Sequence, residues 1–181
     1  MKQLILTSLL LIAFAGYSQE QSLINAVALP NGSYMVKTPP SYKATNLMGG
    51  AIANYSPEAL FDLSSKMWCT AKNTALPCFF IMELTEIYSI QKFVFDNNCE
   101  TNYSGICTKE VKIELSCSSS EQGYFDAGTF ALKPYEKQSF EIRPTDARWI
   151  KITILSNHGN AEYTELAEFE VFAKKVAKAI K

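Results

Sequence analysis

The chain has 181 residues, a formal net charge of −1 and an apolar fraction of 48%. This length and composition are typical of one folded domain with a short appendage. A charge this close to zero excludes the broad basic surface that nucleic-acid binding requires, so we expect no nucleic-acid partner.

The first residues have the pattern of a secretory signal peptide. Lys2 supplies a positive charge, Leu4 to Ala15 form an apolar run, and small residues then lead to a cleavage point near Ser18/Gln19. The run is shorter than the roughly 20 residues that a membrane helix needs. We therefore predict a signal peptide over residues 1–18, and a secreted, periplasmic or cell-surface protein without a stable membrane span. The alternative is an uncleaved N-terminal anchor.

Residues 19–45 form a polar lead-in that contains Pro30-Asn31-Gly32 and Pro39-Pro40. This segment either adds an edge strand at residues 33–36 or tethers the domain, and we assign it as an N-terminal extension or linker. The compact pattern then runs over residues 46–173. A short basic tail, residues 174–181, closes the chain.

Five cysteines follow the signal peptide, and an exported chain can keep disulfides. Their spacing favours the pairs Cys69–Cys78 and Cys99–Cys107, which would clamp two polar loops, but spacing does not fix the connectivity. One thiol is left over in any pairing, and Cys117 is expected to be half-buried and free. The chain has one histidine and no C-x-x-C pair, which argues against a cysteine metal cluster.

Apolar and polar residues alternate in several short segments, which is the two-residue period of a half-buried strand. The segments with this pattern are Phe79 to Leu84, Ile87 to Phe95, Val111 to Leu115, Ile150 to Ile154 and Phe169 to Val171. Turn signals separate them, and no sustained helical period occurs before the last residues. The pattern predicts an all-β fold, an antiparallel β-sandwich.

Five sequence segments resemble the discoidin (coagulation-factor type C) family, and they occur in the order that the family has. They are ALFDLSSKMWCT (59–70), PCFFIMEL (77–84), VKIELS (111–116), ARWIKI (147–152) and ELAEFEVF (165–172). The resemblance covers about residues 46–173. It implies a jelly-roll sandwich of the galactose-binding-like type.

The resemblance also implies one structural calcium ion. Many sugar-binding relatives hold calcium between an acidic turn and the closing strand. By residue-wise match, Asp62 and Glu168 would supply carboxylates, Ala167 a carbonyl and Ser64 a further oxygen. Three departures concern this turn: Leu63 replaces the usual glycine, the turn is about one residue shorter than in the family, and Ser64 stands at the second acidic position. The alternative is that Asp62 caps its own turn and Glu168 pairs with a lysine.

In this family the strand-end loops bind galactose-type sugars, phospholipid headgroups or protein partners. Sugar sites combine an aromatic face with a few hydrogen-bonding groups. Two loops have that mix, and the candidate ligand residues are Asn97, Asn98, Tyr103, Asn157, His158 and Tyr163. Galactose-binding relatives commonly place an arginine where this chain has Asp96 and Asn97. A solvated loop histidine at 158 and loop packing at Tyr103 are the alternatives.

Motifs for catalysis are missing from the sequence. It has neither G-x-S-x-G nor H-E-x-x-H, and Glu168 and Glu170 share one strand face instead of facing each other across a cleft. We predict an exported, non-catalytic module that binds carbohydrate or a glycan-bearing surface. A protein-interaction or adhesion module without a sugar pocket is the alternative, and a divergent glycan-active hydrolase is the third possibility.

Overall fold

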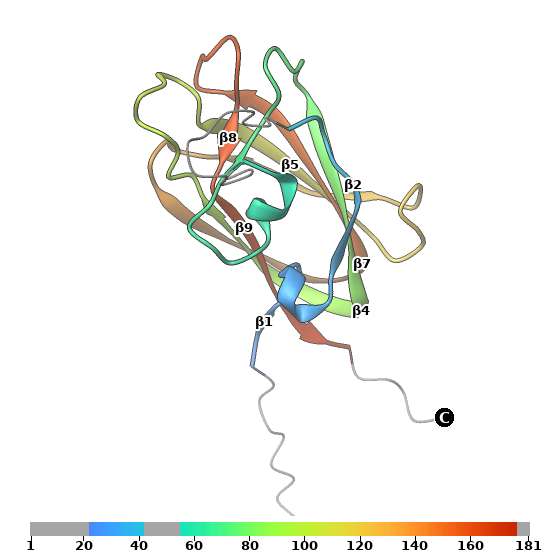
Figure 1. Ribbon diagram of the computed structural model, residues 1–181. Coiled ribbons are helices and arrows are strands. Elements are labelled where there is room, and N and C mark those ends of the chain that lie inside the picture. Colours follow the sequence, from blue (N-terminus) through green and yellow to red (C-terminus); the bar gives the residue numbers. More distant parts are fainter. Residues whose placement is uncertain (1–21, 42–54, 177–181) are drawn as a thin grey trace, which may run out of the picture.

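The computed structural model describes residues 22–41 and 55–176, and β-strands make up most of that part of the chain (Figure 1). The strands are β1 (Ile24–Asn25), β2 (Tyr34–Lys37), β3 (Trp68–Cys69), β4 (Cys78–Asp96), β5 (Thr108–Ser116), β6 (Phe125–Ala131), β7 (Lys137–Asn157), β8 (Glu165–Leu166) and β9 (Glu168–Lys175). Two short 3-10 helices are η1 (Leu29–Asn31) and η2 (Pro57–Leu60). The predicted signal peptide lies outside the described residues.

Seven strands form one sheet in the order β1-β9-β4-β7-β5-β6, with β2 beside β4, and β3 pairs with β8 separately. Every pair of named strands is antiparallel. Side chains from all parts of the large sheet fill one hydrophobic core. The predicted antiparallel β-sandwich is confirmed.

The two longest strands, β4 and β7, supply both sides of the core. Their register shifts between Glu83 and Tyr88, a β-bulge or similar irregularity of the kind that bends a strand pair. Before the shift β4 has β2 as its second neighbour, and after it β4 pairs with β9 instead. One strand pair therefore passes from one layer of the sandwich into the other.

The alternating segments bury the faces that their periodicity predicts. Ile150, Ile152 and Ile154 of β7 are fully buried, and Ile152 stands opposite Phe80 of β4 and Ile113 of β5. Burying each such side chain contributes about 1.5–3 kcal/mol. This central three-strand contact fixes the register of the sandwich, because a one-residue slip would turn every isoleucine toward solvent.

Aromatic rings fix the turn that follows η2 against the rest of the core. Phe61 packs edge-on against Phe80 and Phe169, with ring centroids 5.9 and 6.4 Å apart. The ring centroids of Trp68 and Phe80 are 4.9 Å apart in the same edge-on geometry. This geometry is favourable because the positive edge of one ring points at the negative face of the other. Because Phe61 is the residue before Asp62, this packing holds the predicted calcium turn beneath β9.

Residues 22–41 belong to the sandwich. β1 extends the sheet beside β9, and β2 lies along β4, so the edge-strand alternative for residues 33–36 is the one that the structure has. Between them, Ala26 and Val27 are 4% and 0% exposed. The assignment of residues 19–45 as a linker is therefore wrong for residues 22–41, because their apolar side chains complete the core.

The C-terminal strand runs beyond the predicted domain end at residue 173. β9 continues to Lys175, whose Nζ lies 2.6 Å from Glu86 Oε1. The first residues of the predicted basic tail are thus part of the sheet, and residues 177–181 lie outside the described residues.

All five cysteines lie in the described residues, and all are free thiols. The predicted disulfides Cys69–Cys78 and Cys99–Cys107 are therefore not formed in this structure. Cys117 is exposed instead of half-buried, with its Sγ 3.1 Å from the carbonyl oxygen of Asp146. The difference arises because Cys117 follows the last residue of β5 and begins a surface turn.

Candidate functional site

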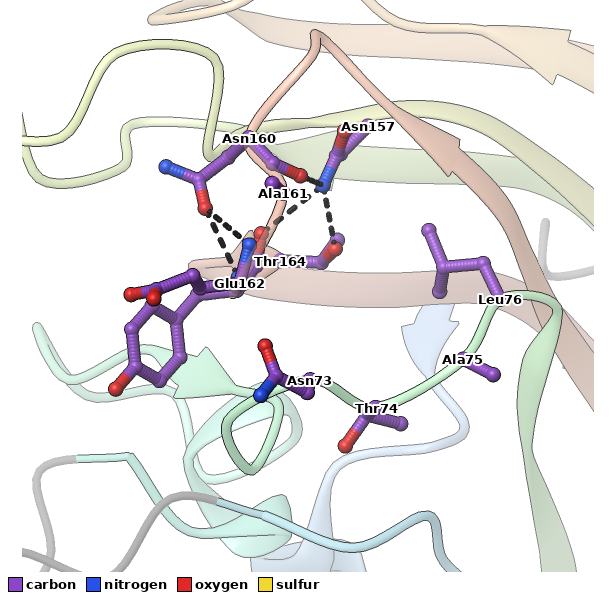
Figure 2. Close-up of a pocket in the computed structure, with 10 residues that line it drawn as sticks. Asn73, Thr74, Ala75, Leu76, Asn157, Asn160, Ala161, Glu162 and Thr164 are labelled. Atoms are coloured by element: carbon purple, nitrogen blue, oxygen red, sulfur yellow. Dashed lines mark hydrogen bonds between the residues drawn. The ribbon is translucent and has the colours of Figure 1, made fainter.

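A pocket of about 320 Å³ lies between the β3–β4 loop (residues 70–77) and the β7–β8 loop (residues 158–164) (Figure 2). This volume is at the lower end of the range for small-ligand sites, about 300–1,000 Å³. The lining residues are Asn73, Thr74, Ala75, Leu76, Asn157, Asn160, Ala161, Glu162, Tyr163 and Thr164. The lining is mostly polar, with one aromatic ring.

Asn157, the last residue of β7, holds the β7–β8 loop in shape. Its Nδ2 lies 2.8 Å from Asn160 O, 2.9 Å from Tyr163 O and 2.9 Å from Thr164 Oγ1 (Figure 2). Its Oδ1 accepts the N–H of Gly159 at 2.9 Å. Two amide hydrogens thus serve three oxygens of one loop, so this side chain forms the wall of the pocket and has no N–H left for a ligand.

Asn160 joins the same loop to its neighbour, residues 97–107. Its Oδ1 accepts the N–H of Glu162 at 3.0 Å, and its Nδ2 donates to Ser104 O at 3.0 Å. The backbone N–H of Asn160 donates to Gly105 O at 3.1 Å. The two loops named by the sequence analysis therefore lie together at one end of the sandwich.

The β3–β4 loop is bound to the opposite side of the β7–β8 loop. The N–H of Thr70 donates to Thr164 O at 2.9 Å, and the N–H of Thr164 donates to Thr70 Oγ1 at 2.9 Å. Farther along, the N–H of Asn73 donates to Glu162 O at 2.8 Å, and Lys72 Nζ lies 3.0 Å from Glu162 Oε1. These contacts fix the width of the pocket.

Three polar groups of the lining remain accessible to a ligand. The exposed Asn73 side chain points into the space between the loops (Figure 2), and the residue has φ +59°, a conformation that asparagine tolerates. Thr74 Oγ1 donates to Ala71 O at 2.8 Å and can still accept. The Glu162 carboxylate is half-exposed, so solvent weakens its ion pair with Lys72.

Three ligand residues were predicted at the end of β7 and in the β7–β8 loop: Asn157 and Tyr163 line the pocket, and His158 does not. The ring atom His158 Nε2 lies 3.0 Å from Leu132 O, and the backbone N–H of His158 donates to Cys107 O at 3.0 Å. The imidazole therefore bridges to the chain after β6. It is half-buried and bonded to the backbone, so it is not a freely solvated loop side chain.

Asn97 has a structural role. Its side chain is fully buried, and Nδ2 donates to Thr108 O at 2.8 Å and to Lys133 O at 2.9 Å. Both amide hydrogens are thus used by backbone carbonyls, and no part of the side chain is open to a ligand. The sequence-based assignment of Asn97 as a ligand residue is not supported by this placement, because a polar type in a loop pattern does not reveal burial.

Asn98 and Tyr103 lie on the surface of the 97–107 loop and do not line the pocket. Asn98 donates through Nδ2 to Asp96 Oδ1 at 2.6 Å. Tyr103 is 49% exposed. Since Asn160 ties this loop to the pocket wall, both residues lie beside the site and stay predictions for its rim.

Sequence reasoning missed the β3–β4 loop as part of the site. The available signal was the polar triplet Lys72-Asn73-Thr74 between Cys69 and Pro77. A polar triplet is equally typical of an ordinary connection. Its role depends on the contact with Glu162, more than 80 residues later in the chain.

The predicted calcium residues meet where the turn after η2 touches the start of β9. Glu168 is 7% exposed; its Oε1 accepts the N–H of Leu63 at 3.3 Å, and its Oε2 is buried without a protein hydrogen-bond partner. Asp62 Oδ1 accepts the N–H of Ser64 at 2.9 Å. Burial raises the pKa of Glu168 to about 8, helped by the nearby negative charges of Asp62 and Glu170.

The backbone and ion-pair contacts around Glu168 describe the surroundings of the predicted calcium site. Ala167 donates its N–H to Asp96 O at 3.0 Å, which holds the segment before β9 in place. Lys137, whose positive charge lies near Glu168, forms its ion pair with Glu170, and the two charged atoms are 2.7 Å apart. Among residues 22–41 and 55–176, no group of three or more His, Cys, Asp or Glu is arranged to hold a metal.

Residues 42–169 match the F5/8 type C domain. The chain belongs to the F5/8 type C family. This confirms the resemblance to the discoidin (coagulation-factor type C) family that the five segments indicated. The matched region starts after β2 and ends within β9, so β1 and β2 lie outside it although side chains next to them share its core.

Solved structures show the same fold at low sequence identity. The C-terminal domain of a Bacteroides fragilis chitobiase is 17% identical, with a TM-score of 0.65 over 86% of this chain and 99% of that one. A Clostridium perfringens CBM32 module in complex with GalNAc-β-1,3-galactose is 18% identical, with a TM-score of 0.62 over 82% and 99%. The family 32 module of C. perfringens NanJ, in complex with galactose, is 15% identical, with a TM-score of 0.59 over 84% and 98%.

No curated protein matches the chain in sequence. The helices found in residues 22–41 and 55–176 are all too short or too polar to cross a membrane.

Proposed function

We propose that this F5/8 type C protein is an exported, non-catalytic module that binds carbohydrate in the pocket between the β3–β4 and β7–β8 loops. Export rests on the predicted signal peptide, and mass analysis of the mature N-terminus in the secreting host tests it. A mature chain that still begins at Met1 would contradict this assignment.

The chemistry of the pocket lining carries the binding proposal. Sugar recognition needs hydrogen-bonding groups fixed in place and an apolar ring against the sugar face. Here Asn73, Thr74 and Glu162 provide the polar groups, and Tyr163 provides a ring. The Asn157 and Asn160 amides hold the walls rigid, which lowers the entropy cost of binding.

The structural neighbours support the same class of ligand. Two of them are carbohydrate-binding modules in complex with galactose and with GalNAc-β-1,3-galactose. Their identity to this chain is below 20%, so the likeness extends to the fold, and the choice of sugar depends on this chain's own loops.

A glycan array probed with the folded protein, with calcium and with EDTA, tests the proposal. We expect binding to a limited set of glycans, and we expect Asn73→Gly to weaken it about 3–10-fold, the loss of one or two hydrogen bonds. Glycine keeps the left-handed backbone at residue 73 and removes only the amide. Leu63→Gly is the comparison variant, because it also places glycine at a left-handed residue but lies outside the pocket.

If the protein binds no glycan on the array and specifically captures a protein partner, the carbohydrate proposal is wrong and an interaction module is favoured. Hydrolysis of a bound glycan over time would overturn the assignment as non-catalytic.

We also propose one structural calcium ion at the turn after η2. The buried, unpartnered Oε2 of Glu168 supports it, because burial disfavours ionisation of this carboxyl group, and a bound cation would stabilise the ionised form. Asp62 and Glu168 would supply the charged oxygens, and Ala167 and Ser64 the neutral ones predicted from the family resemblance. Carboxylates and carbonyls are the oxygen ligands that calcium prefers.

A further inference from the structure

Cys99 and Cys107 lie together beneath the exposed loop that they flank. Their side chains are buried, with 7% and 1% of each residue exposed. The two residues pack together with Ile106 in one small cluster. Both also approach the same acceptor: Cys99 Sγ lies 3.3 Å and Cys107 Sγ 3.5 Å from the carbonyl oxygen of Asn97. Of the two pairings suggested by the sequence, this is the one whose thiols the fold brings into contact.

The backbone on each side holds this arrangement in place. The N–H of Cys99 donates to Asn97 O at 3.0 Å. On the other side, the backbone of Cys107 forms a parallel β-bridge with the backbone of Glu165. The carbonyl oxygen of Cys107 accepts the backbone N–H of His158 at 3.0 Å. These contacts fix the backbone of both cysteines on the two sides of the pair.

The other three cysteines have different neighbours. Cys69 lies beside the Glu165 carboxylate, which helps to raise the pKa of this thiol, although burial is the larger cause. Cys78 is part of the main hydrophobic core. Cys117 is exposed beside Asp146 O. An oxidant that reaches the folded protein therefore meets one prearranged pair.

We propose that Cys99 and Cys107 are an oxidation site, a dithiol pair that forms an intramolecular disulfide and thereby locks the 97–107 loop beside the pocket. The oxidant is a small disulfide such as glutathione disulfide. Two thiol hydrogens and their two electrons pass to it, one S–S bond forms between the cysteines, the S–S bond of the oxidant breaks, and two glutathione thiols leave.

The order of the two exchange steps follows from the environments of the thiols. The hydrogen bond from Cys99 lowers the pKa of Cys107, and the same contact together with burial raises the pKa of Cys99. Cys107 is thus the thiolate that attacks the oxidant and forms a mixed disulfide, because the thiolate is the reactive form. Cys99 then loses its proton and attacks the Cys107 sulfur, which releases the second glutathione.

The pair is connected to the pocket through packing. Tyr163, a pocket residue, packs against the small cluster of Cys99, Ile106 and Cys107. Residues 101–104 of the loop are exposed while both thiols are buried, so the oxidant reaches the thiols when the loop between them moves. Closing a nine-residue ring removes that motion. The redox state of the pair then sets the mobility of one side of the site.

Thiol mapping of the folded wild-type protein in glutathione buffers of graded oxidation tests the proposal without any glycan, and so separately from the proposed function. Alkylation and peptide mass analysis should show Cys99 linked to Cys107 while Cys69 and Cys78 stay alkylatable. The oxidised form should have a Tm about 5–10 °C higher. Amides of residues 100–106 should exchange hydrogen more slowly in it.

Variants separate the pair from other thiols. Cys99→Ser and Cys107→Ser should each abolish the oxidation-dependent rise in Tm, and Cys117→Ser should retain it. If Cys99 and Cys107 stay reduced in buffers that oxidise the urea-unfolded chain, or pair with other cysteines, the proposal is wrong. A disulfide that forms without slowing amide exchange in residues 100–106 would overturn the proposed locking of the loop. The wild-type mapping decides the matter even if a serine variant fails to fold.

Discussion

The backbone N–H of Leu63 lies 3.3 Å from Glu168 Oε1, and this contact joins the turn after η2 to the first residue of the last long strand. Leu63 has φ +61° and is 53% exposed, so its backbone is in the left-handed region while its side chain packs little. In the left-handed conformation the Cβ atom crowds the backbone, and only glycine, which has no Cβ, avoids this strain.

Replacing Leu63 with glycine should therefore stabilise the protein. We expect the free energy of unfolding to rise by about 0.5–1 kcal/mol, since relief of the left-handed strain is partly offset by the larger entropy of glycine in the unfolded chain. Urea unfolding measures the change. Leu63→Ala is the control, because it keeps the Cβ; a glycine variant no more stable than the alanine variant would show that the backbone strain is negligible.

Removal of calcium should destabilise the protein through Glu168. We expect EDTA to lower the Tm, added Ca²⁺ to restore it, and Glu168→Ala to abolish this sensitivity, because the variant lacks the buried carboxylate. Differential scanning calorimetry with and without EDTA gives the comparison. Glu141→Gln, at an exposed position, should respond as the wild type does. An unchanged melting curve in EDTA would rule out the ion as a stabilising element.

Asn157→Asp should loosen the β7–β8 loop. The substitution replaces the Nδ2 donor by an oxygen that would face three other oxygens, and leaving such groups unpaired costs about 1–3 kcal/mol. We expect lower stability and faster amide exchange in residues 158–163. Asn73→Asp is the control, an exposed asparagine with no described partner for its amide. Equal effects of the two substitutions would contradict the scaffold role of Asn157.

Acid should weaken the contact between β2, β4 and β7 at Glu83. The hydrogen bond from Tyr34 lowers the pKa of Glu83 below its ordinary value of 4.5, with help from Trp149 and from Arg148 at 2.7 Å. Because the folded-state pKa is the lower one, this stabilisation is present above about pH 4.5 and is lost as the pH falls through the folded-state pKa.

Unfolding measured from pH 6 to pH 3 should therefore show a smaller loss of stability in Glu83→Gln than in the wild type. The difference should be below about 1 kcal/mol, because the Arg148 side chain is partly exposed and solvent screens the pair. Identical pH profiles would show that the cluster does not contribute to acid stability.

The local alternation of residues determined the fold class. In a strand, alternate residues lie on the same face, so Ile150, Ile152 and Ile154 share one apolar face. This face can be read from the local sequence alone, whichever strands pair with it. The same holds for Phe169 and Val171. The order of five short segments then indicated the family, since segment order along the chain needs no tertiary information.

Tertiary structure decided the site. Asn97 and Asn73 are both loop asparagines in sequence, yet one is buried with both amide hydrogens bonded to backbone carbonyls, and the other is exposed in the pocket. Burial of a loop side chain depends on segments far away in sequence, and no local pattern encodes it. The same reason separates the contacting thiols of Cys99 and Cys107 from Cys69 and Cys78: spacing along the chain suggested both pairs, and only the folded backbone brought one pair together.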